Sequence, residues 1–206
     1  MESVLDFSEM YRRVGVSRDQ DILAVVNAMP EPRRSEAHAA IAAVETEALQ
    51  AMVLTSGALQ LGAWCAARGI PMGLVTRNTA SSVAFFHDKH WSPRRPFSPA
   101  VARDHGLEHK PHPAALLHCS SVWGVDPSCC VMIGDSPRDD IVAGRRAGML
   151  TILLAGSTGR LARGANASAV AAQLDGERVP HATAESLDGV PALLEQLFQV
   201  CEQDAV

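Results

Sequence analysis

The sequence predicts an α/β fold, a doubly wound parallel sheet joined to a small α-helical region. Short apolar runs at 70–76, 130–134 and 150–154 have the length and composition of buried parallel strands, and helical segments separate them. In the first part of the chain, apolar residues recur at helical spacing and nothing alternates as in a strand. We therefore expect two parts, a helical region at 1–52 and an α/β core at 53–206.

The spacing of apolar residues and the position of prolines predict the helices of residues 1–52. Phe7, Met10 and Val14 recur at helical spacing. A proline-containing break follows, and Ser35 is then expected to cap a long Ala- and Glu-rich helix that runs to about Met52. This region is therefore predicted to be helical throughout.

The core is predicted to begin with a helix that Ser56 caps and that ends at Gly69, where glycine accepts a left-handed conformation. The Pro-rich segment 91–99 and the segment 156–175 are predicted as loops. The remaining helices are expected at 79–90, 113–124, 139–147 and 190–200, and a last short strand at 181–183.

The composition limits the classes of function. The chain has 206 residues, of which 47% are hydrophobic and 20% charged, as in ordinary globular proteins. Its formal net charge of −5 gives no reason to expect binding to nucleic acid or to an anionic membrane. Five cysteines without a C-x-x-C pair favour reduced thiols in a cytosol-like compartment. We expect a cytoplasmic protein, or an organellar one if the natural N-terminus lies further upstream.

An acidic loop follows the second predicted strand. In GDSPRDD, residues 134–140, Asp135 projects from the strand tip and Asp139 falls in the first turn of the next helix. Ligands of parallel α/β sheets bind beyond the carboxyl ends of the strands. Carboxylates that converge there suit Mg²⁺. The alternative is structural, because acidic side chains also favour the positive end of a helix.

Two further polar groups occupy comparable positions. Thr76 ends the first apolar strand and precedes Arg77 and Asn78, so a hydroxyl and backbone N–H groups are available for phosphate oxygens. Lys110 precedes the helix that Pro113 begins, and its ammonium is able to neutralise a phosphate or a carboxylate. Considered alone, Thr76 is also consistent with an ordinary strand end, and Lys110 with a solvated loop lysine. Their order along the chain is what indicates a shared site.

These segments together resemble the haloacid dehalogenase-like (HAD) hydrolase superfamily. GLVTRN at 73–78 is similar to the second motif of that family, and KPHP at 110–113 is similar to the third. VMIGDSPRDDIVAGRRAGM at 131–149 is similar to the fourth motif, and HATAESLDGVPALL to the closing strand and helix. The resemblance covers about residues 53–200, and the helical start is similar to the small cap of many members.

The resemblance implies a Mg²⁺-dependent phosphatase that hydrolyses phosphomonoesters of small metabolites. It implies that Asp135 binds the Mg²⁺ ion and that Asp139 supports it. It also implies catalytic roles for Lys110 and Thr76. We expect substrate contacts from Thr76, Arg77, Asn78 and Lys110.

The first family motif, an apolar strand followed by D-x-D-G-T, has no clear counterpart. In the family its first Asp attacks phosphorus and its second acts as general acid and base. Asp19 and Asp21 have the right spacing but follow no apolar strand. Asp6 follows a short apolar pair, which makes it a candidate for a degenerate nucleophile, although residue 8 is serine. The same segment is also similar to the chain just downstream of the motif in cap-bearing members.

The missing motif has structural and functional consequences. In the family its strand lies between the strands of the second and fourth motifs. Without it we expect two inner strands that lack a partner, a weaker Mg²⁺ site, and a truncated or marginally stable chain. The function is then that of an impaired phosphatase or of an inactive HAD-fold binding or regulatory protein. A receiver-type phosphorylation switch is disfavoured by the order of its acidic residues, and a dinucleotide fold by the absence of G-x-G-x-x-G.

Overall fold

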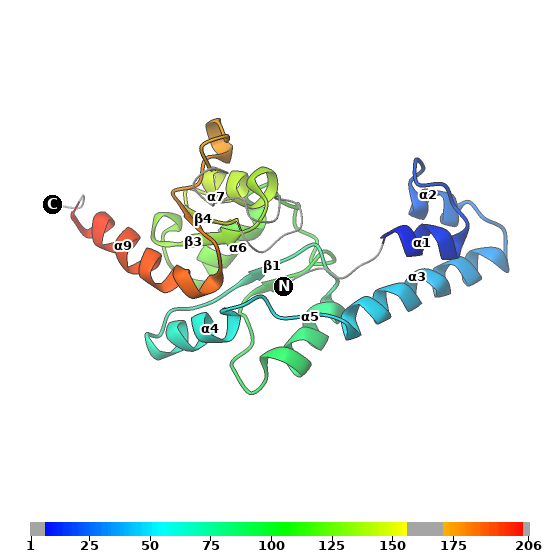
Figure 1. Ribbon diagram of the computed structural model, residues 1–206, viewed down its shortest axis with the longest axis horizontal. Coiled ribbons are helices and arrows are strands. Elements are labelled where there is room, and N and C mark those ends of the chain that lie inside the picture. Colours follow the sequence, from blue (N-terminus) through cyan, green and yellow to red (C-terminus); the bar gives the residue numbers. More distant parts are fainter. Residues whose placement is uncertain (1–6, 156–170, 204–206) are drawn as a thin grey trace. The chain divides into compact units, whose positions relative to one another are not determined.

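The computed structural model describes residues 7–155 and 171–203 of the chain (Figure 1). The chain divides into two compact units, Met1–Leu54 and Thr55–Val206. Most of the loop predicted at 156–175 lies outside the described residues. No helix in the part of the chain that is described is both long and apolar enough to cross a membrane. That the first unit serves as a cap stays a prediction.

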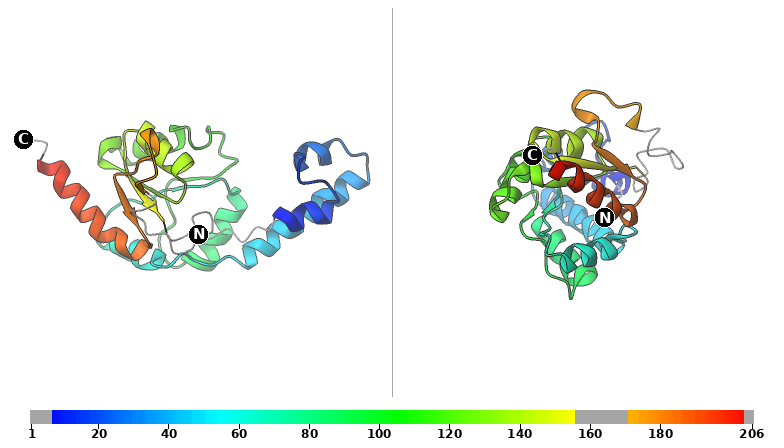
Figure 2. Two further views of the ribbon diagram at one scale, coloured as in Figure 1. Left: turned by 45° about the horizontal axis from the view of Figure 1, so that its top comes forward. Right: turned by 90° about the vertical axis from the view of Figure 1, so that its left-hand side faces the viewer.

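The described part of the first unit consists of α1 (Phe7–Val14), α2 (Ile22–Asn27) and α3 (Arg33–Gln50). Figure 2 shows α1 lying along α3, and the core between the helices contains Met10, Val14, Val26, Ile41 and Val44. Asp21 caps α2, because its carboxylate accepts a hydrogen bond from the backbone N–H of Ala24 at 3.0 Å. The predicted cap at Ser35 is wrong, because α3 begins at Arg33 and the Ser35 hydroxyl donates to Glu31, which precedes the helix.

The described strands of the second unit form two parallel sheets. The first pairs β1 (Leu74–Val75) with β2 (Ala100–Val101). The second contains β3 (Val131–Gly134), β4 (Leu150–Leu154) and β5 (Ala182–Ala184), in the order β3-β4-β5. The apolar runs predicted as strands are therefore confirmed, although the first run contributes only the two residues of β1.

Helix α4 (Ala58–Ala67) precedes β1, and α9 (Val190–Gln203) follows β5. The helices that connect strands are α5 (Ala80–Phe86), α6 (Ala114–Trp123) and α7 (Val142–Arg146). Two π-helical turns lie at η1 (His87–Trp91) and η3 (Pro137–Ile141). Single 3₁₀ turns lie at η2 (Pro127–Cys129), η4 (Gly176–Arg178) and η5 (Leu187–Gly189). The turn η3 contains Asp139 and Asp140 of the acidic loop and therefore positions their side chains.

Helices cover both faces of the three-stranded sheet (Figure 1). On one face, Val131 and Ile133 of β3 pack with residues of α4 and α9. On the other face, Met132 packs with residues of α6 and α7. This alternation follows from the pleat of a strand, in which successive side chains point to opposite faces. The predicted doubly wound α/β architecture is confirmed.

The strands β1 and β3 each have a ladder partner on one side alone within the described residues. Their residues are half-buried throughout, whereas β4, which has a neighbour on each side, is buried from Thr151 to Leu154. Val75 of β1 nevertheless contributes to the same apolar cluster as Met132 of β3. That a central strand is missing between β1 and β3 stays a prediction.

Two local features differ from the expectation. The sequence does not predict β2, because a two-residue strand after a Pro-rich loop is too short to show periodicity. Gly57, not Ser56, is the N-cap of α4, with a φ of 80° that favours glycine. The Ser56 hydroxyl instead donates to the carboxylate of Asp188 at 3.1 Å.

We expect Gly62 of α4 to be intolerant of a side chain. A Cβ atom there would lie 2.4 Å from the ring of Trp91, which is 2% exposed. Alanine favours a helix by about 1 kcal/mol, but the buried ring would have to move. Gly62→Ala should therefore lower the free energy of unfolding by about 1–3 kcal/mol, measured by urea denaturation. The control is Gly189→Ala, where nothing lies within 4 Å, and equal stabilities of the two variants would contradict the packing.

His181 is expected to make the second unit sensitive to acid. Its Nδ1 lies 3.0 Å from both the backbone nitrogen and the hydroxyl oxygen of Thr151. Burial, and secondarily the charge of Arg145, lowers the pKa of His181 below 6.5. The unfolded chain therefore binds the proton more readily, so the stability contributed by neutral His181 is lost as the pH falls below about 6.5.

The measurement is the free energy of unfolding at about pH 7.5 and about pH 5.5. We expect a smaller decrease for His181→Gln than for the unaltered protein. Some decrease will persist in the variant, because burial also lowers the pKa of His87. An equal decrease in both proteins would show that His181 does not bind the proton responsible.

Candidate functional site

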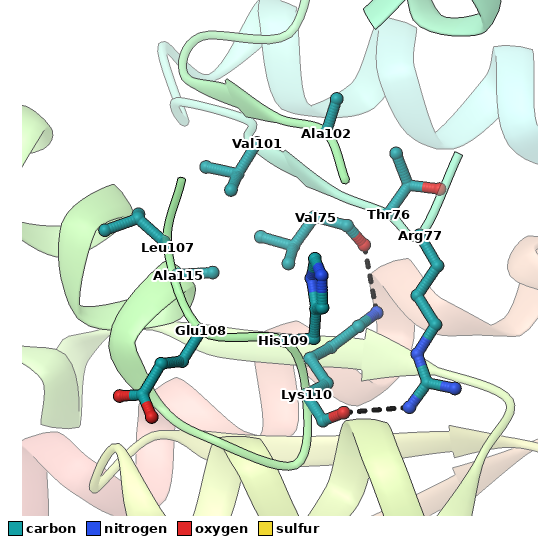
Figure 3. Close-up of a pocket in the computed structure, with 10 residues that line it drawn as sticks. All are labelled: Val75, Thr76, Arg77, Val101, Ala102, Leu107, Glu108, His109, Lys110 and Ala115. Carbon is teal, nitrogen blue, oxygen red and sulfur yellow. Dashed lines mark hydrogen bonds between the residues drawn. The ribbon is translucent and has the colours of Figure 1, made fainter. Parts of the chain in front are cut away.

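The carboxyl ends of β1 and β3 meet around the side chain of Lys110. This residue lies on the loop before α6, and its Nζ donates a hydrogen bond to the carbonyl oxygen of Val75 at 2.9 Å. The same ammonium lies 2.7 Å from Oδ1 of Asp140 in η3. Figure 3 shows Lys110 lining a pocket together with Thr76 and Arg77, which follow β1. The structure thus brings the polar ends of both strands to one place.

Asp140 is the central acceptor of this arrangement, and sequence reasoning did not single it out. Its Oδ2 accepts hydrogen bonds from the backbone N–H groups of Asp135 and Ser136, both at 3.0 Å, and the residue is 5% exposed. Gly134 provides the necessary room, because a Cβ atom there would lie 2.3 Å from that oxygen. Asp140 therefore holds the acidic loop and the ammonium of Lys110 at the same time.

Asp139, predicted to support a metal ion, faces an arginine. Its Oδ1 accepts a hydrogen bond from Nη2 of Arg77 at 2.8 Å, and its Oδ2 accepts one from the Ser136 hydroxyl at 3.2 Å. The same Arg77 nitrogen donates to the carbonyl oxygen of Lys110 at 2.8 Å, and the side chain of Arg77 is 59% exposed. Arg77, predicted to contact substrate, therefore also joins three segments of the chain.

Among the described residues, none accepts a hydrogen bond from the Thr76 hydroxyl. Its Oγ1 accepts a hydrogen bond from the backbone N–H of Asn78 at 3.1 Å. A hydroxyl that accepts in this way still has a donor of its own. The carbonyl oxygen of Asn78 in turn accepts from the backbone N–H of Arg103 at 2.8 Å, which ties this turn to the chain after β2. The turn after β1 is thereby fixed from two sides.

Asp135 carries a carboxylate that fits a Mg²⁺ ligand. Burial raises the pKa of Asp135 above its usual range, and the charge of Asp140 raises it further. A half-buried carboxylate beside another one is stabilised as an anion by a divalent cation. Mg²⁺ commonly takes one or two carboxylates together with phosphate oxygens and waters. Within residues 7–155 and 171–203, no group of three or more His, Cys, Asp or Glu side chains is arranged to hold a metal.

The sequence offers Asp6 and Asp21 as candidate nucleophiles. Asp21 caps α2 in the first unit, and Asp6 lies outside the described residues. In the described part of the second unit, the carboxylates that interact with Lys110 are those of Asp140 and Asp135. Both belong to the segment after β3. The described site therefore contains an ammonium and carboxylates, and no nucleophile is assigned in it.

Comparison with known proteins identifies the family. Residues 108–187 match a family model described as HAD-hydrolase-like. The chain is 33% identical over 169 residues to a haloacid dehalogenase-like hydrolase domain-containing protein of Arabidopsis thaliana, which covers 76% of this chain and 66% of that protein. It is 33% identical over 152 residues to an uncharacterized hydrolase of Saccharomyces cerevisiae, covering 72% and 68%. The chain belongs to the HAD hydrolase superfamily.

Further similarities extend to a phosphatase and to a solved structure. This HAD chain matches N-acylneuraminate-9-phosphatase of Mus musculus at 32% identity over 90 residues, covering 44% of this chain and 32% of that protein. A HAD hydrolase structure from Entamoeba histolytica aligns with a TM-score of 0.64 at 16% identity, over 93% of this chain and 89% of that chain. At that identity the structural match establishes the fold. The chain spans about two thirds of the plant and yeast relatives.

We expect Asp140→Asn to be strongly destabilising. The substitution removes the anion that faces the Lys110 ammonium, whose side chain is 12% exposed. A buried charge without its partner costs several kcal/mol, so the free energy of unfolding should fall by about 2–4 kcal/mol. Asp139→Asn breaks a pair whose arginine is exposed and should cost less than about 1 kcal/mol. Urea denaturation of both variants measures the difference, and equal losses would contradict the central role of Asp140.

Proposed function

We propose that this HAD chain binds the phosphoryl group of a small phosphorylated metabolite together with Mg²⁺, as the phosphate-handling core of a phosphomonoester phosphatase. The carrying observation is the position of the Lys110 ammonium between the end of β1 and Asp140. The match to a protein named as a phosphatase supports phosphate esters as the class of substrate. The composition supports a cytoplasmic location.

The residues around the pocket have donors suited to a phosphate group. The ammonium of Lys110 has three N–H donors, of which Val75 and Asp140 accept two, so within the described residues one is available to a phosphate oxygen. The Thr76 hydroxyl offers a second donor from the end of β1. A fixed positive charge at this point offsets negative charge on an entering phosphoryl group. The phosphate would thus bind at the carboxyl edge of β1.

Mg²⁺ would be held by Asp135 and would supply further positive charge against the phosphate oxygens. The backbone N–H of Asp135 donates to Asp140, which fixes the start of the acidic loop on the side of the pocket where Lys110 lies. Asp139 accepts a hydrogen bond from Arg77, so it would support the metal site without binding the ion directly. In this proposal Asp135 binds the metal ion and Asp140 maintains the geometry.

We further propose that hydrolysis by this chain is impaired. Phosphoryl transfer through a covalent intermediate needs a nucleophilic side chain beside the phosphate. Asp140 already accepts hydrogen bonds from two backbone N–H groups and pairs with Lys110. The alternative is an inactive HAD-fold protein that binds phosphorylated ligands for regulation. Both interpretations share the phosphate site and differ in turnover.

The phosphate site is tested by calorimetric binding of inorganic phosphate with and without Mg²⁺. We expect binding that Mg²⁺ strengthens and that Lys110→Met weakens by about tenfold or more, because a charge-assisted hydrogen bond is lost. Thr76→Val, which removes a neutral donor, should weaken binding less. Lys89→Met is the control, because Lys89 is the chain's other lysine and its side chain is 61% exposed. Unchanged affinity in both site variants would overturn the proposal.

Impaired hydrolysis is tested with an aryl phosphate and Mg²⁺. We expect turnover close to the uncatalysed rate. Substantial turnover that persists in Asp6→Asn and in Asp21→Asn would mean that a nucleophile exists elsewhere in the chain. Turnover that disappears only in Asp6→Asn would identify Asp6 as the nucleophile and would also contradict the proposed impairment.

A further inference from the structure

Polar side chains connect the two sheets of the second unit at their carboxyl ends. Within the described residues, no ladder joins the β1–β2 sheet to the β3–β5 sheet. One connection is made by the Lys110 ammonium, between Val75 and Asp140. The other is made by Arg77, whose partner Asp139 lies in η3 beyond β3. Both connections lie at the pocket that Arg77 and Lys110 line.

Arg77 contacts Lys110 at the backbone and not at the ammonium. Its Nη2 atom donates to the carbonyl oxygen of Lys110 and to Oδ1 of Asp139, both at 2.8 Å. Figure 3 shows the side chain running from the end of β1 alongside Lys110 to that carbonyl oxygen. The other oxygen of Asp139 accepts from the Ser136 hydroxyl at 3.2 Å, which orients the carboxylate toward Arg77. Ser136, Asp139, Arg77 and the Lys110 backbone thus form one continuous chain of hydrogen bonds.

A lysine side chain needs such support to act as a fixed charge. Its four-carbon stem is flexible, so contacts at the ammonium alone leave the start of the stem free to move. In this structure the ammonium is bound by Val75 and Asp140, and the main chain of Lys110 is bound by Arg77. Both ends of the side chain are therefore restrained, and a different residue restrains each end.

We propose that Arg77 is a positioning residue, which through Asp139 and the backbone of Lys110 holds the Lys110 ammonium at the end of β1. The effect of Arg77 on the position of Lys110 does not depend on any reaction. Its effect on phosphate binding rests on the proposed function. Asp139 then belongs to the same chain of hydrogen bonds, which explains why a residue expected to support a metal ion binds an arginine.

The alternative is that Arg77 binds phosphate directly, since its side chain is 59% exposed at the pocket. The two roles predict opposite effects of Asp139→Asn. For a positioning residue, loss of the Asp139 charge loosens Arg77 and with it Lys110, so phosphate binding weakens. For a direct ligand, the same substitution frees the guanidinium from a competing anion, so phosphate binding strengthens.

The first experiment measures the position of Lys110 without any ligand. The chain has only two lysines, so limited acylation by an amine reagent followed by mass spectrometry gives the rate at Lys110 relative to the exposed Lys89. We expect Arg77→Gln and Asp139→Asn each to raise that ratio by about three- to tenfold. The double variant should resemble either single one, because both remove the same restraint. Arg95→Gln, at an exposed arginine elsewhere in the unit, should leave the ratio unchanged.

Arg77→Lys provides a further readout, because a lysine retains a charged donor. It should restore part of the protection of Lys110, whereas a role in folding alone would not distinguish lysine from glutamine in this way. Circular dichroism confirms that the variants compared are folded. Unchanged acylation of Lys110 in both Arg77→Gln and Asp139→Asn overturns the proposal.

The second experiment measures the affinity for inorganic phosphate in the same variants. A loss of about three- to tenfold in Asp139→Asn supports positioning. A gain overturns it in favour of direct binding by Arg77. If the unaltered chain binds no phosphate, the proposed function fails, and the acylation ratios still decide whether Arg77 positions Lys110.

Discussion

The ion pair between Lys110 and Asp140 is the interaction on which the candidate site depends. A buried ion pair contributes little by itself, because both charges lose their water. Here the cost is offset by three further hydrogen bonds, from the Lys110 ammonium to Val75 and to Asp140 from the backbone of Asp135 and Ser136. The pair thereby joins the loop before α6 to the ends of both β1 and β3.

The site depends on this ion pair because the described strands of the second unit form two separate sheets. In a continuous parallel sheet, backbone ladders would align β1 with β3, and site residues would need only to point into the cleft. In the described part of this HAD chain no ladder joins these strands, and Val75 shares an apolar cluster with Met132 instead. Apolar packing is non-directional. The directional contacts come from Lys110, Asp140 and Arg77, so the same residues serve the fold and the site.

The order of strands, helices and polar strand ends could be predicted from local sequence. Apolar runs at 130–134 and 150–154 became β3 and β4, and Thr76, Lys110 and Asp135 were placed at the carboxyl edge. Other features have no local signal. Adjacent aspartates look alike in a sequence, and only the turn η3 directs Asp140 inward to Lys110 and Asp139 outward to Arg77. The cap of α4 was misassigned, because serine is a usual cap and glycine acts there through its positive φ.

The sequence by itself determined the fold class and the family, because periodicity and motif spacing are properties of neighbouring residues. Tertiary structure alone decided which carboxylate meets Lys110 and which meets Arg77. Those pairings join residues 30 or more positions apart, such as Lys110 with Asp140 and Arg77 with Asp139. Their geometry is set by the meeting of separate segments at one edge of the core, which no local pattern records.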